Sequence, residues 1–118
     1  MANPNIVNVT SIYGNTSVAN LSTSTANVLT NSSSSNNVVK VNTLSVANYS
    51  NTAITSSVVF NRSNNIYYFV GSVVVPANST IVVVGKDTSV YLTEGDVIQA
   101  NASANSASSL IVSYEIIN

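Results

Sequence analysis

Residues that favour β-strands and turns dominate this chain, and strong helix formers are scarce. Val and Ile make up 29 of the 118 residues, and Ser, Asn and Thr make up another 51. Branched side chains pack well on pleated strands, whereas Ser and Asn compete with a helical backbone for hydrogen bonds. The length is that of one ordinary domain. The sequence therefore predicts a single all-β domain over 1–118, built as an antiparallel β-sandwich.

Alternating apolar and polar residues locate the strands. Near the C-terminus, Leu110, Val112 and Tyr114 alternate with polar positions, and the alternation changes phase near Asn42, which indicates a β-bulge. Residues 1–15 form either an edge strand or an N-terminal arm. Strands are expected over 5–13, 16–21, 38–49, 52–62, 66–75, 80–86, 89–93, 97–103 and 109–117, with a loop over 31–37 and turns at Asn64-Asn65 and Glu94-Gly95-Asp96.

Charge is the second constraint on what the chain can do. Only seven side chains are ionised at neutral pH, and the net charge is −1. Three cations are too few to neutralise a useful number of phosphates, so we expect neither nucleic acid nor a membrane surface as a partner. The opening segment MANPNIVNV lacks the basic region and apolar core of a signal peptide. We therefore expect a protein made in the cytoplasm without a secretion signal.

The residues needed for common enzyme and metal chemistry are missing. There is no His and no Cys, and neither lysine stands in a Ser-x-x-Lys pattern. Glu94 and Asp96 are better explained as a polar turn around Gly95 than as a catalytic pair. A calcium site at Asp87, Glu94 and Asp96 is conceivable, because calcium prefers clustered oxygen ligands, but the spacing of these residues matches no known calcium-binding loop. We expect no catalytic residue, no metal site and no cofactor.

Two segments, 66–75 and 81–84, are apolar on both faces of the expected strands. A sandwich strand should present one polar face to water, so a second covering layer is implied. Because no helix is expected in this chain, the covering layer would have to come from another subunit. The alternative is a central strand with a few exposed valines. The expected interface residues are Val73, Val74, Val75, Val82, Val83, Val84, Tyr67 and Tyr68.

The segment VYLTEGDVIQANAS, followed by SLIVSYEII, resembles the closing strands of trimeric jelly rolls of the complement and tumour-necrosis-factor type. The matching positions are Leu92, Gly95, Asp96 and either Ile98 or, with the register shifted by one, Val97. The resemblance covers about 30 residues and implies a sandwich of jelly-roll type that forms trimers.

A second resemblance covers nearly the whole chain. The features that carry it are an early turn at Gly14-Asn15-Thr16, followed by Val75-Pro76-Ala77, Lys86-Asp87, Tyr91-Leu92, Glu94-Gly95-Asp96 and Ser113-Tyr114-Glu115. In these features the sequence is similar to small virion structural proteins of tailed phages, especially phages of marine bacteria and cyanobacteria. One departure is a lower number of charges in the middle of this chain, and no functional residue is carried over.

These observations together favour a non-enzymatic virion component, most simply a capsid decoration or cement protein. Its expected partners are itself, as a homotrimer, and other virion proteins such as the major capsid protein. One alternative is a tail, neck or fibre-tip module that binds a host glycan or receptor, for which the tyrosines could form a platform. Another is a self-assembling extracellular filament or matrix protein. The tyrosines are Tyr13, Tyr49, Tyr67, Tyr68, Tyr91 and Tyr114.

The absence of His and Cys gives a first testable prediction. Because no structural metal is expected, the melting temperature should be the same with and without EDTA, as measured by circular dichroism. A clear fall in EDTA would instead indicate a bound cation at Asp87, Glu94 and Asp96.

Overall fold

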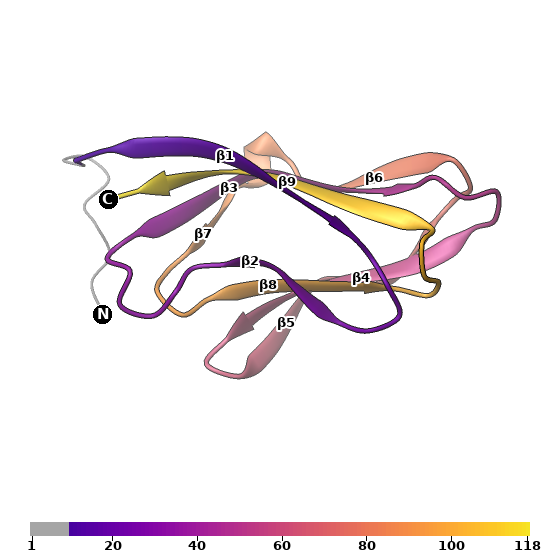
Figure 1. The fold of residues 1–118 in the computed structure, drawn as a ribbon, viewed down its shortest axis with the longest axis horizontal. Helices are drawn as coiled ribbons and strands as arrows, with labels where there is room; N and C mark the ends of the chain where they lie inside the picture. The colour runs from indigo at the N-terminus through magenta and orange to yellow at the C-terminus, as the bar shows by residue number, and fades with distance from the viewer. Residues whose placement is uncertain (1–9) are drawn as a thin grey trace.

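The computed structural model describes residues 10–118, which form nine strands in two antiparallel sheets (Figure 1). This confirms the predicted all-β sandwich. A single turn of 3-10 helix spans Lys86–Thr88. The strands are β1 Ile12–Asn20, β2 Ala26–Thr30, β3 Val38–Asn48, β4 Ile54–Arg62, β5 Asn65–Val75, β6 Ser79–Val84, β7 Val90–Leu92, β8 Val97–Ala102 and β9 Ser108–Ile117.

The strand order is that of a jelly roll. Sheet I has the order β1-β9-β3-β6, with β7 pairing the other half of β3 beside β6, and sheet II has the order β2-β8-β4-β5. The pairing is nested: β1 pairs with β9, β2 with β8, β3 with β6 and β7, and β4 with β5. A long antiparallel hairpin wrapped over a sandwich has this pattern. The upper and lower layers of Figure 1 are sheets I and II.

Near the N-terminus one expected feature is wrong and one strand was missed. The predicted turn at Gly14 does not exist, because β1 runs straight through it and Gly14 pairs with Glu115. The predicted strand over 5–13 lies mostly outside the described residues. β2 was not predicted, because its sequence ANVLT has only two large apolar residues, and a register shift between Asn27 and Leu29 breaks its alternation.

The turns and bulges follow local backbone chemistry. The bulge near Asn42 is confirmed by a register shift between Val41 and Thr43. The β4–β5 turn lies one residue earlier than predicted, at Ser63 and Asn64, both of which have positive φ angles. Two such residues match the twist of the flanking strands in a tight hairpin. The predicted Glu94–Asp96 turn is present, with Gly95 at φ +88°.

An aliphatic core lies between the two sheets. It is formed by inward-facing Val, Leu and Ile residues, and the alanines of β8 keep the sheets close together at its centre. Phe60 and Phe69 are only half-buried and pack at the rim of this core. The core thus consists of small side chains, and the larger rings lie at one margin. The fully buried aliphatic residues include Val41, Leu44, Val46, Val58, Val75, Leu92, Ile98, Leu110 and Val112.

A buried asparagine closes one end of the sandwich. Asn48, at the end of β3, donates hydrogen bonds from Nδ2 to the carbonyl oxygens of Thr52 (2.8 Å) and Val75 (3.0 Å). Its Oδ1 accepts hydrogen bonds from the backbone N–H (2.9 Å) and the hydroxyl (2.7 Å) of Ser50. One neutral side chain therefore satisfies the polar groups of a loop that crosses from sheet I to sheet II.

A second buried asparagine satisfies polar groups in another set of loops. Asn31 donates from Nδ2 to the carbonyl oxygens of Asn37 (3.0 Å) and Leu92 (2.9 Å). Its Oδ1 accepts a hydrogen bond from Ser35 Oγ (2.6 Å), and its carbonyl accepts one from the N–H of Gly95 (2.7 Å). The Ser- and Asn-rich loop over 31–37 is thereby attached to the turn between β7 and β8.

The role of Asn48 can be tested by converting its amide to a carboxylate. In Asn48→Asp, the carbonyl oxygens of Thr52 and Val75 lose the amide donor and face a negative charge, so we expect a loss of about 2–4 kcal/mol in the free energy of unfolding. Urea denaturation measures this loss. Asn51→Asp adds the same charge at an exposed position of the same loop and should change stability by less than about 0.5 kcal/mol. Equal losses in the two variants would contradict the assigned role.

Candidate functional site: an aromatic groove and uncharged strand edges

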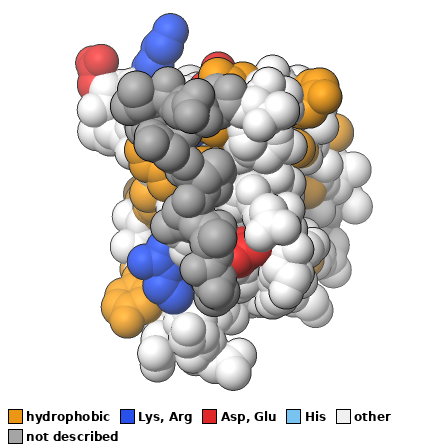
Figure 2. Space-filling view, turned by 90° about the vertical axis from the view of Figure 1, so that its left-hand side faces the viewer, with side chains coloured by type: hydrophobic (Ala, Val, Ile, Leu, Met, Phe, Trp, Pro, Cys, Tyr) orange, Lys and Arg blue, Asp and Glu red, His pale blue; other side chains and the backbone are white. Residues whose placement is uncertain are grey.

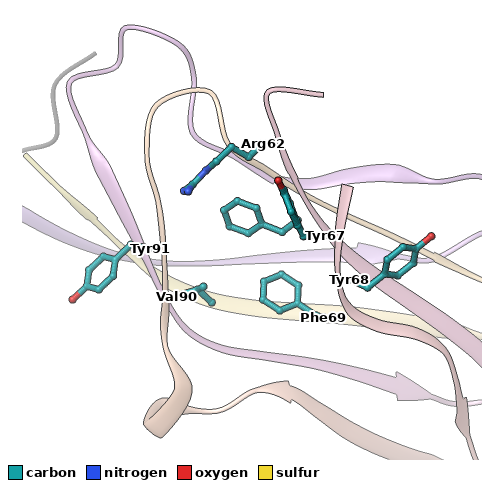
Figure 3. Close-up of a pocket in the computed structure, with 7 residues that line it drawn as sticks. Arg62, Tyr67, Tyr68, Phe69, Val90 and Tyr91 are labelled. Carbon is teal, nitrogen blue, oxygen red and sulfur yellow. The ribbon is translucent and has the colours of Figure 1, made fainter. Parts of the chain in front are cut away.

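An aromatic groove lies where the two sheets separate. It has a volume of about 480 Å³ and is bordered by β4 and β5 of sheet II and by β7 of sheet I (Figure 3). The rings of Phe60 and Phe69 meet edge to face, with centroids 6.0 Å apart and planes at 68°. The groove is lined by Phe60, Arg62, Tyr67, Tyr68, Phe69, Val90 and Tyr91.

A bulge in β5 explains why the rings gather there. Val58 pairs with Val70 and Val59 pairs with Tyr68, so Phe69 is an extra residue that shares the inner side with Val70. Tyr67 pairs with Phe60 and lies on the same side, whereas the Tyr68 ring points the other way in Figure 3. The apolar run in this strand therefore results partly from the bulge, which turns consecutive apolar residues inward.

An ion pair fixes one wall of the groove. Arg62, the last residue of β4, contacts Asp96 with both ends of its guanidinium: Nε to Oδ1 at 2.9 Å and the terminal nitrogen to Oδ2 at 2.6 Å. The same guanidinium lies 5.1 Å from the centre of the Phe60 ring. The backbone N–H and the hydroxyl of Thr93 also donate to Asp96. The arginine is therefore held in place, and its charge is already compensated.

Burial and hydrogen bonding act in opposite directions on Asp96. Burial alone would raise the pKa of its carboxyl group, but the hydrogen bonds from Arg62 and Thr93 outweigh burial and hold the pKa below its ordinary value. The hydrogen bond to Asp96 likewise raises the pKa of Arg62. Both groups are thus charged at neutral pH, and the pair serves to position the hairpin.

The predicted interface residues divide between the core and the surface. Val75 and Val84 belong to the core, with 0% and 2% of their surface exposed, and so cannot contact a partner. Val74 and Val82 point outward and are 59% and 68% exposed. Tyr67 and Tyr68 are also exposed, while Val73 and Val83 are half-buried. Each run of three valines, 73–75 and 82–84, presents one outward side chain, as expected because three consecutive strand residues cannot all face the core.

The outward valines lie on the two edge strands of one side of the molecule, each on the outer face of its own sheet. β5 is the edge strand of sheet II, β6 is the edge strand of sheet I, and the two are in contact. Val74 pairs with Thr55 on the outer face of sheet II, and Val82 pairs with Ser45 on the outer face of sheet I. The edge formed by these two strands is called the β5–β6 edge below.

An apolar row that the sequence analysis missed crosses the outer face of sheet I. Val18 pairs with Ile111, Ile111 pairs with Ser45, and Ser45 pairs with Val82, so these residues lie side by side on four strands. Both Val18 and Ile111 are exposed. The signal in the sequence was present, because Ile111 interrupts the polar positions of its strand.

The strand edges carry no charge. In the described part of the chain the outermost strands are β1 and β6 in sheet I and β2 and β5 in sheet II, and none of them contains Asp, Glu, Lys or Arg. Natural sheets commonly protect such edges with charged residues, above all Lys. Figure 2 shows one end of the molecule, where several charged side chains and hydrophobic side chains lie among the white polar side chains and backbone.

The acidic residues do not assemble a cation site in the described chain. Asp87 is exposed on the 3-10 helix, and Asp96 is paired with Arg62. Within residues 10–118, no group of three or more acidic, His or Cys residues is placed to hold a metal ion. The same residues contain no helix that is both long and apolar enough to cross a membrane.

No protein-family model matches this sequence, and no curated protein matches it significantly.

The ion pair gives a prediction for stability against pH. Because the pKa of Asp96 is lower in the folded than in the unfolded chain, its contribution is complete above the unfolded pKa of about 3.9 and is lost as the pH falls through the folded pKa. The free energy of unfolding should therefore decline below about pH 4, and Asp96→Asn should flatten that decline. Urea titrations at several pH values measure it.

Asp87→Asn is the matched control, because it removes the same charge from an exposed carboxylate. It should leave the decline unchanged. If wild type and Asp96→Asn lost stability in parallel on acidification, the ion pair would not be the group responsible.

Proposed function

We propose that this protein is a non-enzymatic structural component of a phage particle, a capsid decoration protein that self-associates through its β5–β6 edge. The observation that carries the proposal is the combination of an uncharged strand edge with outward apolar side chains. Tyr67, Val74 and Val82 are all exposed at this edge. The whole-chain resemblance to phage virion proteins supports the setting, and jelly rolls are a common fold of capsid proteins.

The occupant of this edge is inferred to be a second copy of the chain. An uncharged edge offers unpaired backbone groups, and the aromatic groove beside it provides a pocket for a neighbour's side chain. With a net charge of −1, two copies repel each other very weakly. A closed trimer fits the resemblance to trimeric jelly rolls and leaves no β5–β6 edge open for further growth.

The energetics require the whole edge to take part. Burying one outward valine against a partner stabilises the complex by about 1–2 kcal/mol, and a tyrosine by more. Association costs about 4–15 kcal/mol in lost translational and rotational freedom. Val74 and Val82 alone would therefore not hold two copies together. Tyr67 and the rings on the inner side of the groove must be buried as well, whereas Tyr68, whose ring points the other way, stays exposed. Each subunit of a closed ring contributes the same set.

The proposed assembly predicts a defined mass in solution. Analytical ultracentrifugation should give a trimer at micromolar concentration, with a mass that barely changes between low and high salt, because apolar contacts and not ion pairs hold the interface. A monodisperse monomer at that concentration would refute self-association.

Single substitutions at the β5–β6 edge should break the assembly. Val74→Asp and Val82→Asp each place a charge in a dry interface and should shift the mass to that of the monomer while the melting temperature changes little. Thr23→Asp, in an exposed loop between β1 and β2, is the matched control and should remain a trimer. Val83→Asp is unsuitable, because Val83 packs against the core and its replacement would unfold the domain.

The virion assignment has its own test. Quantitative mass spectrometry of purified particles of the encoding phage should find hundreds of copies per particle if the protein decorates the capsid. A count in the tens would place it in a tail fibre instead, and its absence from particles would overturn the virion assignment even if the trimer were confirmed.

A further inference from the structure

A ladder of amide side chains crosses the outer face of sheet II. Asn61 of β4 donates from Nδ2 to Gln99 Oε1 of β8 (3.4 Å), and Gln99 Nε2 donates to Asn27 Oδ1 of β2 (2.8 Å). In a parallel row, Asn101 Nδ2 donates to Thr25 Oγ1 (2.9 Å). These bonds hold the amides in fixed orientations across three strands. Each amide keeps donor or acceptor capacity that the ladder does not use.

A hollow of about 200 Å³ lies beside this ladder. Its apolar base is Val59, which faces outward from sheet II and yet is only 7% exposed. Tyr68 stands at one side with 69% of its surface exposed, and Gln99 and Asn101 stand at the other. The hollow therefore combines an accessible aromatic ring, an apolar floor and a set of oriented amides.

We infer that this hollow binds a neutral glycan. Sugar hydroxyl groups both donate and accept hydrogen bonds, which suits amides that present donors and acceptors in one row. The C–H face of a sugar ring is apolar and can pack on Tyr68, whose hydroxyl stays in water. The hollow is smaller than the pockets of about 300–1,000 Å³ that enclose drug-sized ligands, so one sugar unit of a longer chain would be seated in it.

Charge excludes anionic ligands. No Lys, Arg, Asp or Glu lines the hollow. Arg62, the last residue of the same β4 strand, has its guanidinium committed to Asp96. A phosphate or a sialic acid would therefore find no compensating cation, whereas a neutral hexose loses nothing by that absence.

A peptide is disfavoured by the position of the hollow. Peptides that bind to sheets commonly add a strand at an edge, where backbone groups are free. β8 and β4 lie inside sheet II, and their backbone groups are paired with β2, with each other and with β5. The hollow lies on the outer face of sheet II and shares Tyr68 of β5 with the aromatic groove, but the inference does not rest on the proposed self-association.

Binding can be tested with a printed panel of neutral oligosaccharides (glucans, galactans and mannans), sialylated oligosaccharides and neutral peptides, followed by titration of the best ligand. We expect neutral glycans to bind with millimolar to micromolar affinity. In ¹H–¹⁵N spectra the side-chain amide signals of Asn27, Gln99 and Asn101 should shift on titration. A preference for sialylated glycans or for peptides, or the absence of any binding, would overturn the inference.

Matched variants separate the hollow from other tyrosine-rich surfaces. Tyr68→Ala should weaken binding about tenfold, whereas Tyr68→Phe should retain most of it, because stacking needs the ring and not the hydroxyl. Tyr49→Ala removes an exposed tyrosine from the loop after β3 and should bind like wild type. Gln99→Glu turns a donor into a charged acceptor facing Asn27 Oδ1 and should also weaken binding. Equal affinity of the two alanine variants would contradict the site.

Discussion

Nested strand pairing is the constraint on which the rest of this structure depends. β1 pairs with β9 and β2 pairs with β8, so partners are separated by most of the chain. The loops must then cross from one sheet to the other, and their polar groups must be satisfied where they pass over the core. The chain has too few charged residues for this task, and Asn31 and Asn48 perform it with neutral amides. The asparagine-rich composition is therefore partly a structural requirement of the loops.

The scarcity of charge shapes the surface as much as the loops. Hydroxyl and amide groups hydrate the sheet faces, and such groups are insensitive to salt because there are few ion pairs to screen. The scarcity of charged residues also removes the usual protection of strand edges. β5 shows the remaining means of protection: two register irregularities and a positive φ angle at Ser72 interrupt it. β6 has neither charge nor bulge at Thr80–Val82, which makes it the more exposed template for pairing.

Sequence reasoning was successful where alternation is regular and failed where the backbone departs from it. The strands with clear alternation, such as β8 and β9, were predicted nearly to the residue. β2 was missed because its polar sequence and its irregular register hide the period. For the run around Tyr67–Val70, the sequence suggested a second covering layer or a central strand with exposed valines, and neither explanation included a bulge. The bulge accounts for part of the run, because an extra residue changes which side chains face the core.

The functional surfaces were harder to foresee than the fold, because they depend on which strands become neighbours. The alternation of 97–103 shows that Gln99 and Asn101 face away from the core, but not that Asn27 and Asn61 stand beside Gln99. That requires the strand order β2-β8-β4. Likewise Val18, Ile111 and Val82 appear unrelated in sequence and form one row only through β1-β9-β3-β6 pairing. The sequence determines the chemistry of each strand, whereas topology determines which chemistries are combined.

The two outer faces of the sandwich are chemically different, and this difference gives the proposed assembly a direction. Sheet I presents an apolar row, which gives up no hydrogen bonds to water when protein covers it. Sheet II presents oriented amides and a tyrosine ring, which can bind the proposed glycan only if they stay exposed. A subunit held by its β5–β6 edge would bury Val82 at one end of the apolar row and leave Val18 and Ile111 of sheet I and the amides of sheet II available. In the proposed assembly, sheet I would lie against the particle and sheet II would face the medium, so that one small domain could attach to a lattice and still present a binding surface.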